Sequence, residues 1–238
     1  MINLIMIKLV IFDMDGVLVD SEPAITDASI KALAEIGITA KPADFKEFTG
    51  MGDEKFIAGV AGKHGGTYSE ALKLRAYEIY GKNPGMVKVF PKARRLLHNL
   101  LTSGVKCAVA SAGDTVRVML NLSIVNPGKS VKIVRTGETV PSEGRRLFPL
   151  YVVTGSDVVN KKPDPEIFLK AAALSGINPV DSIVVEDALS GVKAGKAAGA
   201  KVIAVTTSFP RKALIEAGAD YVVDSLYDVW DVLKGEST

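Results

Sequence analysis

Short apolar runs alternate with longer amphipathic segments along most of the chain. Six of these runs, most of them rich in Val and Ile, have the composition of strands that are buried on both faces of a parallel sheet. The predicted strands are Ile7–Phe12, Val105–Ala110, Tyr151–Thr154, Ser182–Glu186, Lys201–Val205 and Asp220–Val223.

Between these runs the apolar residues recur at helical spacing. Pro91–Leu101 places its Ala and Leu residues on one face and has Pro in its first turn. Further helices are predicted within Asp164–Gly176, which opens with Asp-Pro and stops at Gly, and over Leu189–Ala198. The alternation of strands and helices predicts an α/β fold, a Rossmann-like parallel sheet with right-handed crossovers.

Residues 21–89 interrupt this alternation, because only helical patterns occur there. Three helices are predicted, one ending at Gly37, one around Phe56–Ala61 and one over Ser69–Tyr80. An all-helical block of this length indicates a separate domain, so we expect a helical cap domain at 21–89 and a catalytic core formed by 1–20 and 90–238. The block begins just past the tip of the first strand, where α/β ligand sites lie, and we therefore expect it to act as a lid.

A second interruption lies between Ser123 and Pro149. Strand-like Val131–Arg135 and Glu138–Val140 flank Thr136-Gly137, which predicts a β-hairpin flap.

Composition narrows the classes of function. The 238 residues include 29 Lys and Arg and 27 Asp and Glu, so we expect no nucleic-acid partner, which would need a clustered basic excess. A single cysteine, Cys107, excludes an intramolecular disulfide and a Cys-rich metal site. The apolar stretch Met1–Phe12 is shorter than the roughly 20 residues that span a bilayer, and it lacks the features of a signal peptide. We expect a cytoplasmic protein without a membrane partner.

Two carboxylates follow the first predicted strand. Asp13 and Asp15 would lie at the carboxyl end of that strand, in the ligand crevice of an α/β sheet, and Gly16 allows a sharp turn there. Carboxylates this close repel one another, and a hard cation such as Mg²⁺ removes the repulsion because it takes carboxylate oxygen ligands. Alone, the pair is as consistent with a solvated loop.

Other strand ends carry complementary groups. Ser111-Ala112-Gly113 offers a hydroxyl and backbone N–H groups for a phosphate, Lys161-Lys162 precedes a predicted helix, and Glu186-Asp187 is a second acidic pair. Acidic residues for a metal, with a hydroxyl and a lysine for an anion, indicate phosphoryl transfer. The sequence contains neither a P-loop nor a dinucleotide-binding glycine motif.

The ordered motifs FDMDGVLVD, ASAG, KKPDPEIF and VVEDALSGVKAGKAAGA resemble those of the haloacid dehalogenase-type phosphohydrolases. The resemblance covers nearly the whole chain. It is closest to the branch with a helical cap after the first strand, which includes phosphoglycolate phosphatases, sugar-phosphate phosphatases and β-phosphoglucomutase. It implies a Mg²⁺-dependent phosphatase that hydrolyses a small phosphorylated metabolite, a sugar or polyol phosphate, through an aspartyl-phosphate.

The resemblance also implies a role for individual residues. Asp13 would be the nucleophile, Asp15 the general acid and base, and Lys162 the bridge between nucleophile and phosphate. Phosphoryl oxygens would be held by Ser111 and by the N–H of Ala112. The implied metal ligands are the Asp13 side chain, the Asp15 carbonyl, Glu186 and Asp187.

The cap loop Gly50-Met51-Gly52 would enter the site and touch the leaving group, with an ordinary interhelix turn as the alternative. The phosphomutases of the family carry a His in the first cap helix and an Arg just after this loop, where the present chain has Ile25 and Asp53. A phosphatase is therefore favoured, and a β-phosphoglucomutase-like phosphomutase is the alternative.

Two non-enzymatic alternatives are a phospho-receiver domain and a catalytically silent binding domain. The chain order of the acidic pairs and the helical block argue against a receiver, and the full set of catalytic side chains argues against a silent domain. Residues 128–146 have no counterpart in the family; a surface insertion is the main interpretation and a contact with substrate or partner the alternative. We expect a monomer, with an oligomer as the alternative.

Overall fold

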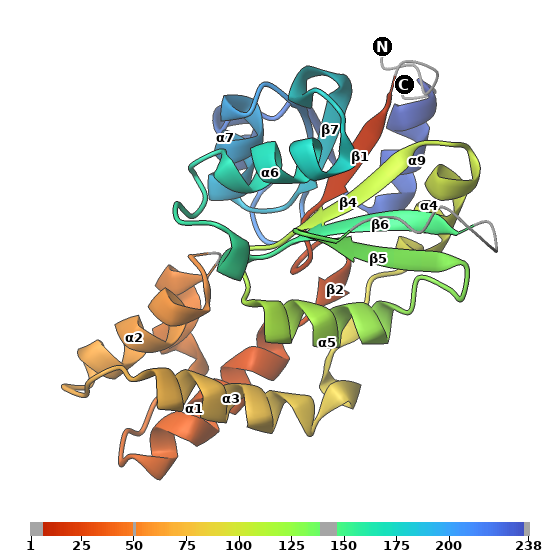
Figure 1. The fold of residues 1–238 in the computed structure, drawn as a ribbon. Coiled ribbons are helices and arrows are strands. Elements are labelled where there is room, and N and C mark those ends of the chain that lie inside the picture. The colour runs from red at the N-terminus through yellow and green to blue at the C-terminus, as the bar shows by residue number, and fades with distance from the viewer. Residues whose placement is uncertain (1–6, 50, 139–146, 236–238) are drawn as a thin grey trace.

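The computed structural model describes residues 7–49, 51–138 and 147–235. Within these residues, seven parallel strands form one sheet in the order β5-β6-β4-β1-β7-β8-β9 (Figure 1). The strands are β1 (Leu9–Phe12), β4 (Lys106–Ala110), β5 (Val131–Arg135), β6 (Phe148–Val153), β7 (Ser182–Glu186), β8 (Lys201–Val205) and β9 (Tyr221–Val223). The parallel α/β sheet predicted from the apolar runs is confirmed.

Alternating side chains of the strands build two separate cores. Leu9 and Ile11 of β1 pack on one face with α6 (Glu166–Ser175), α7 (Leu189–Ala197) and α8 (Arg211–Glu216). Val10 and Phe12 pack on the other face with three further helices. These are α4 (Ala93–Thr102), α5 (Thr115–Val125) and α9 (Leu226–Lys234). Side chains of a strand alternate between the two faces, so a continuous apolar run serves both layers.

The strand β5 departs from the expected hairpin. Val131–Arg135 pairs in parallel with β6, from Val131 opposite Phe148 to Arg135 opposite Val152, and forms the edge of the main sheet. The hairpin prediction is wrong for this segment, because its apolar side chains fall on both faces and are buried better in a sheet than in a flap. The second predicted arm lies mostly outside the described residues, since they end at Glu138.

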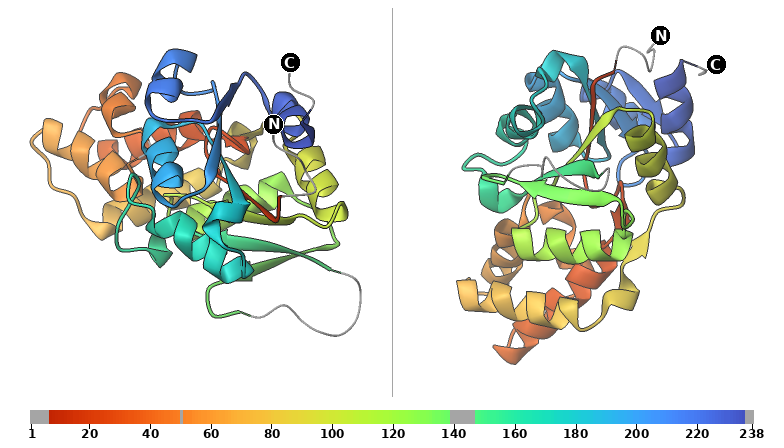
Figure 2. Two further views of the ribbon diagram at one scale, coloured as in Figure 1. Left: turned by 90° about the horizontal axis from the view of Figure 1, so that it is seen from above. Right: turned by 45° about the vertical axis from the view of Figure 1, so that its right-hand side comes forward.

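Residues 22–86 form a helical unit beside the sheet. It contains α1 (Glu22–Glu35), α2 (Asp53–Lys63), α3 (Glu70–Gly81) and the 3-10 segments η2 (Pro42–Phe48) and η3 (Pro84–Met86). The short antiparallel strands β2 (Val19–Asp20) and β3 (Lys88–Val89) connect it to the sheet. The helix α3 packs against α5 and α1 packs against α3, on the side of the molecule away from α6 and α7 (Figures 1 and 2).

Two further 3-10 turns are η4 (Gly155–Asp157) and η5 (Pro179–Asp181). In the described part of the chain, none of the helices combines the length and the apolar character required to cross a membrane.

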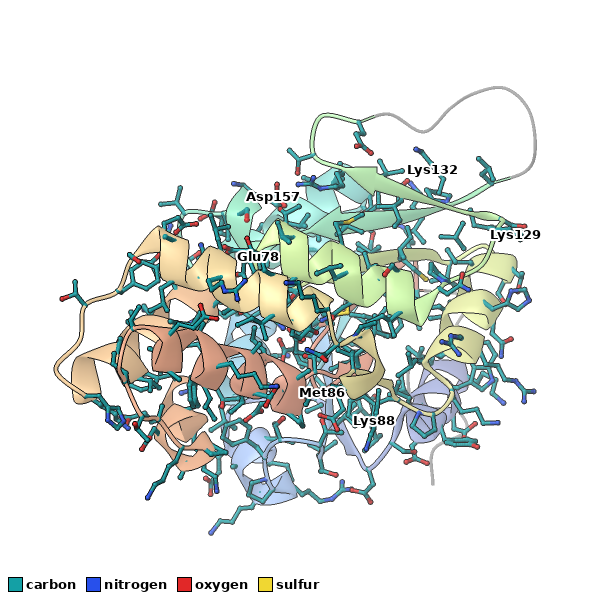
Figure 3. The ribbon with its side chains drawn as sticks, turned by 90° about the horizontal axis from the view of Figure 1, so that it is seen from below. Glu78, Met86, Lys88, Lys129, Lys132 and Asp157 are labelled. Carbon is teal, nitrogen blue, oxygen red and sulfur yellow. The ribbon has the colours of Figure 1, made fainter. Side chains whose placement is uncertain are left out.

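The place of β5 in the sheet predicts that a substitution to Asp lowers the free energy of unfolding by different amounts at two positions of this strand. Val134 is buried at 2% exposure in the core that faces α6, whereas Lys132, labelled in Figure 3, is exposed. Val134→Asp places an unpaired carboxylate in that core and should lower the free energy of unfolding by about 2 kcal/mol or more. The measurement is urea unfolding followed by circular dichroism.

The matched control is Lys132→Asp, which adds a carboxylate two residues away on the same face of the strand, at a position that is exposed. Its unfolding midpoint should stay close to that of the unmodified chain. Equal midpoints for the two variants would contradict the burial of β5.

Candidate active site

Two strand ends and one loop bring charged side chains together at the carboxyl edge of the sheet. Asp13 follows β1, Glu186 ends β7, and Lys162 lies in the loop before α6. The Lys162 Nζ atom is 2.5 Å from Asp13 Oδ1 and 2.6 Å from Glu186 Oε1, and all three side chains are buried. Lys161, in contrast, donates to the carbonyl of Gly155. Of the two adjacent lysines, Lys162 therefore connects the two acidic motifs.

The Glu186 carboxylate is satisfied on both oxygens. Oε1 accepts from Lys162, and Oε2 accepts from the backbone N–H groups of Asp187 and Ala188, both at 2.9 Å. The first turn of α7 comes so close that a Cβ at Gly191 would lie 1.8 Å from Oε1. Glycine at this position is what allows the carboxylate to lie against the helix.

Asp187 extends toward the loop after β1. Its Oδ2 atom accepts hydrogen bonds from the hydroxyls of Ser208 and Thr207. A Cβ at Gly16 would lie 1.8 Å from the same oxygen, and Gly16 has a φ of +81°. Both the left-handed backbone and the close approach require glycine at this turn, so the two acidic motifs are in direct contact here.

Asp15 is surrounded by hydrogen-bond donors. Its Oδ1 accepts from the Ser21 hydroxyl, from Arg117 Nη1 at 2.7 Å and from Asn121 Nδ2 at 3.2 Å. Its Oδ2 accepts from the Ser111 hydroxyl at 3.4 Å. Sequence reasoning missed Arg117 and Asn121. The available signal was two polar residues four positions apart on one face of an apolar helix, where side chains point the same way.

The predicted phosphate-binding residues adjoin this carboxylate. Ser111 is fully buried, and its Oγ also accepts from the N–H of Gly113 at 3.2 Å. Ala112 and Gly113 line the same cavity as Asp13 and Lys162. A hydroxyl and a turn of backbone before α5 therefore lie beside the acidic pair, as the sequence predicts.

Burial and mutual repulsion raise the pKa values of two carboxyl groups in the site. Burial raises the pKa of Asp13 to about 7; the Lys162 charge opposes this rise, while Glu186 and Asp15 add to it. Burial, reinforced by Glu186 and Asp13, also raises the pKa of Asp187 well above its ordinary value. Burial alone would lower the pKa of Lys162, but Asp13 and Glu186 outweigh it and raise that pKa. Lys162 therefore stays charged, and the acidic groups around it remain in excess.

An excess of buried carboxylates suits a divalent cation. Asp13 and Asp187 supply carboxylate oxygens and Asp15 a backbone carbonyl, which are the donors that Mg²⁺ takes. Within the described residues, no three His, Cys, Asp or Glu side chains are arranged as a ready metal cage. The fit to a cation therefore rests on the chemistry and charge of the donors.

The helical unit closes one side of the site through Asp53. This residue begins α2, is 5% exposed, and its carboxylate lies 3.0 Å from both Nε and Nη2 of Arg117. It also accepts from the Tyr77 hydroxyl at 2.7 Å and the N–H of Asp114 at 3.0 Å. Burial alone would raise the pKa of Asp53, but Arg117 and these hydrogen bonds outweigh it and hold the pKa below its ordinary value.

The predicted cap loop divides between two openings. Gly52 lines the cavity of about 330 Å³ that contains Asp13. Met51 is 45% exposed and lines a neighbouring cleft with Lys55 and Lys161. The third predicted residue, Gly50, lies outside the described residues.

Comparisons with known proteins agree with this geometry. Protein SUPPRESSOR OF QUENCHING 1, chloroplastic, from Arabidopsis thaliana is 34% identical over 239 residues, which cover 97% of this chain and 21% of that protein. The yeast Saccharomyces cerevisiae protein 2-deoxyglucose-6-phosphate phosphatase 1 is 29% identical, over 96% of this chain and 92% of its own. The chain thus spans about a fifth of the first relative and most of the second.

A crystal structure of a putative β-phosphoglucomutase from Thermotoga maritima superposes with a TM-score of 0.70 at 27% identity, covering 96% of this chain and 99% of that one. The sequence model of the haloacid dehalogenase-like hydrolases matches residues 7–199. The chain belongs to the haloacid dehalogenase-like hydrolase family.

Proposed function

We propose that the chain is a Mg²⁺-dependent phosphatase that hydrolyses a small sugar or polyol phosphate through an aspartyl-phosphate on Asp13. The observation that carries this proposal is the buried contact of Lys162 with both Asp13 and Glu186, beside Asp15 in one cavity. The likeness to 2-deoxyglucose-6-phosphate phosphatase 1 supports a small phosphorylated substrate.

The side chains of the site supply a nucleophile, a general acid and base, and a lysine for two displacements. An Asp13 carboxylate oxygen attacks phosphorus, the bond to the leaving oxygen breaks, and Asp15 donates its proton to that oxygen. Water then attacks the phosphorus, Asp15 takes a proton from it, and the bond to Asp13 breaks. Lys162 and the hydroxyl and backbone around Ser111 hold the phosphoryl oxygens.

When bound, Mg²⁺ would supply the positive charge that offsets the phosphate and lets it approach a carboxylate. Asp13, Asp187 and the carbonyl of Asp15 would hold it. Glu186 has its oxygens occupied by Lys162 and two backbone N–H groups, so we assign it chiefly to the positioning of Lys162. We further propose that the helical unit is a cap that covers the cavity.

The nucleophile is tested by Asp13→Asn. The amide has nearly the same shape but cannot form the phosphoenzyme, so kcat should fall by roughly 10³-fold or more while the fold is kept. Phosphate release from a panel of sugar phosphates measures kcat, and circular dichroism measures the fold. The control is Asp27→Asn, a surface aspartate paired with Lys31, which should keep its activity. Near-full turnover by Asp13→Asn would refute the nucleophile.

Removal of the metal is a second test. EDTA should abolish phosphate release and added Mg²⁺ should restore it, because the buried carboxylates repel the phosphate without the ion. Asp187→Asn should raise the Mg²⁺ concentration for half-maximal activity about tenfold or more. Asp220→Asn, which removes a surface partner of Lys196, is the matched control. Activity that is indifferent to EDTA would contradict the proposed cation.

The likeness to a putative β-phosphoglucomutase makes a phosphomutase the second candidate. Against it, the position just after the cap loop holds Asp53, whose carboxylate is taken up by Arg117. With β-glucose 1-phosphate and a trace of the 1,6-bisphosphate, we expect free phosphate to accumulate. Glucose 6-phosphate without free phosphate would establish the phosphomutase instead.

A further inference from the structure

The cavity beside Asp13 is strongly acidic. Among the described residues that line it, seven are Asp or Glu and two, Arg117 and Lys162, are cationic. Lys162 is engaged by Asp13 and Glu186, as the site geometry shows. Arg117 is engaged by Asp15 and Asp53, at 2.7 Å and 3.0 Å. Both cations of the lining are therefore already neutralised by protein carboxylates.

The ion pair of Asp53 and Arg117 lies beside the position that the proposed mechanism gives to the leaving group. Arg117 donates through Nη1 to Asp15, the residue assigned to the leaving oxygen, and through Nε and Nη2 to Asp53. Atoms attached to the leaving oxygen would therefore come within a few ångströms of this pair. The pair is nearly inaccessible to water, at 6% exposure for Arg117 and 5% for Asp53, so water would screen a further charge poorly.

The rest of the lining fits a neutral or cationic molecule. Phe48, Phe56 and Phe90 supply aromatic surface, and Asp20 and Glu22 add carboxylate acceptors near the start of α1. Carboxylates accept hydrogen bonds from hydroxyls and ammonium groups, and aromatic faces pack against carbon-bound hydrogens or cations. A carboxylate or a second phosphate on the leaving group would face Asp20, Glu22 and Asp53, with an Arg117 that is already paired.

We propose that Asp53 is a specificity-determining residue: by occupying Arg117, it excludes substrates whose leaving group carries an anionic group. The substrate class is then the monophosphate of a neutral or amino-substituted polyol. This inference rests on the proposed phosphatase function and adds the charge of the leaving group to it.

Two matched series of probes test the proposal on the unmodified protein. The first is 2-hydroxyethyl phosphate, phosphoethanolamine and 2-phosphoglycolate, which share a two-carbon chain with a neutral, cationic or anionic end. The second is glucose 6-phosphate, glucosamine 6-phosphate and 6-phosphogluconate. We expect kcat/KM for phosphate release to be at least tenfold lower for the anionic member than for the neutral member of each series.

The variant Asp53→Asn tests the assigned residue. Without the carboxylate, Arg117 has a free edge for an anion, so the ratio of kcat/KM for the anionic probe to that for the neutral probe should rise at least tenfold, mainly through a lower KM for the anionic probe. The ratio is taken within one preparation, so a loss of folded protein cancels. Asp53→Glu, which retains the charge, and Asp44→Asn, a surface carboxylate of the same unit next to His64, should leave the ratio unchanged.

The outcomes separate the two proposals. If p-nitrophenyl phosphate is hydrolysed but the anionic probes are equal to or better than the neutral ones, or if Asp53→Asn leaves the ratio unchanged, the specificity proposal is overturned and the phosphatase stands. If neither p-nitrophenyl phosphate nor any probe loses its phosphate, the phosphatase proposal is wrong and the specificity proposal falls with it.

Discussion

One buried ammonium group, that of Lys162, joins two carboxylates that would otherwise repel each other at the end of the sheet. Removing one member of a buried ion pair costs about 3–5 kcal/mol, since the partner is left uncompensated. Asp13, Glu186 and Lys162 therefore fix one another, and with them the ends of β1 and β7 and the loop before α6. Asp187 adds a carboxylate whose pKa is raised because burial, Glu186 and Asp13 outweigh the opposing charge of this lysine, which is why the site is suited to a further positive charge.

The close packing of these charges leaves no room for side chains at two glycines. At Gly16 and Gly191 a Cβ would collide with the carboxylates of Asp187 and Glu186. Glycine weakens a helix or loop because it loses more backbone conformational entropy on folding than other residues. It nevertheless occurs at both places where the backbone contacts a carboxylate. The acidic motifs and the glycines beside them therefore belong together, because the carboxylates can lie this close to the backbone only where the backbone has no side chain.

The sequence predicts most of the residues that meet at this site. Parallel strands that are buried on both faces are recognisable as apolar runs, and their carboxyl ends lie at one edge of the sheet. The strand at Ser182–Glu186 and the meeting of Asp13 with Lys162 follow from that rule. The strand that pairs with β5 could not be predicted in this way, because an extended pattern does not indicate which strand lies next to it. The contact of Arg117 with Asp15 could not be predicted either, because it depends on how α5 is rotated and on its packing against α3.

The docking of α3 on α5 ties the helical unit to the chemistry. Tyr80 donates to Asn121, which donates to Asp15, and Tyr77 donates to Asp53, whose partner Arg117 also holds Asp15. Any displacement of the helical unit from the sheet would therefore remove the hydrogen bonds from Tyr80 to Asn121 and from Arg117 to Asp53, and so free the two α5 side chains that hold Asp15. A buried polar group that loses its hydrogen-bond partner is left unsatisfied unless water replaces that partner. The orientation of the Asp15 carboxylate and the position of the helical unit therefore depend on the same hydrogen-bond network and change together.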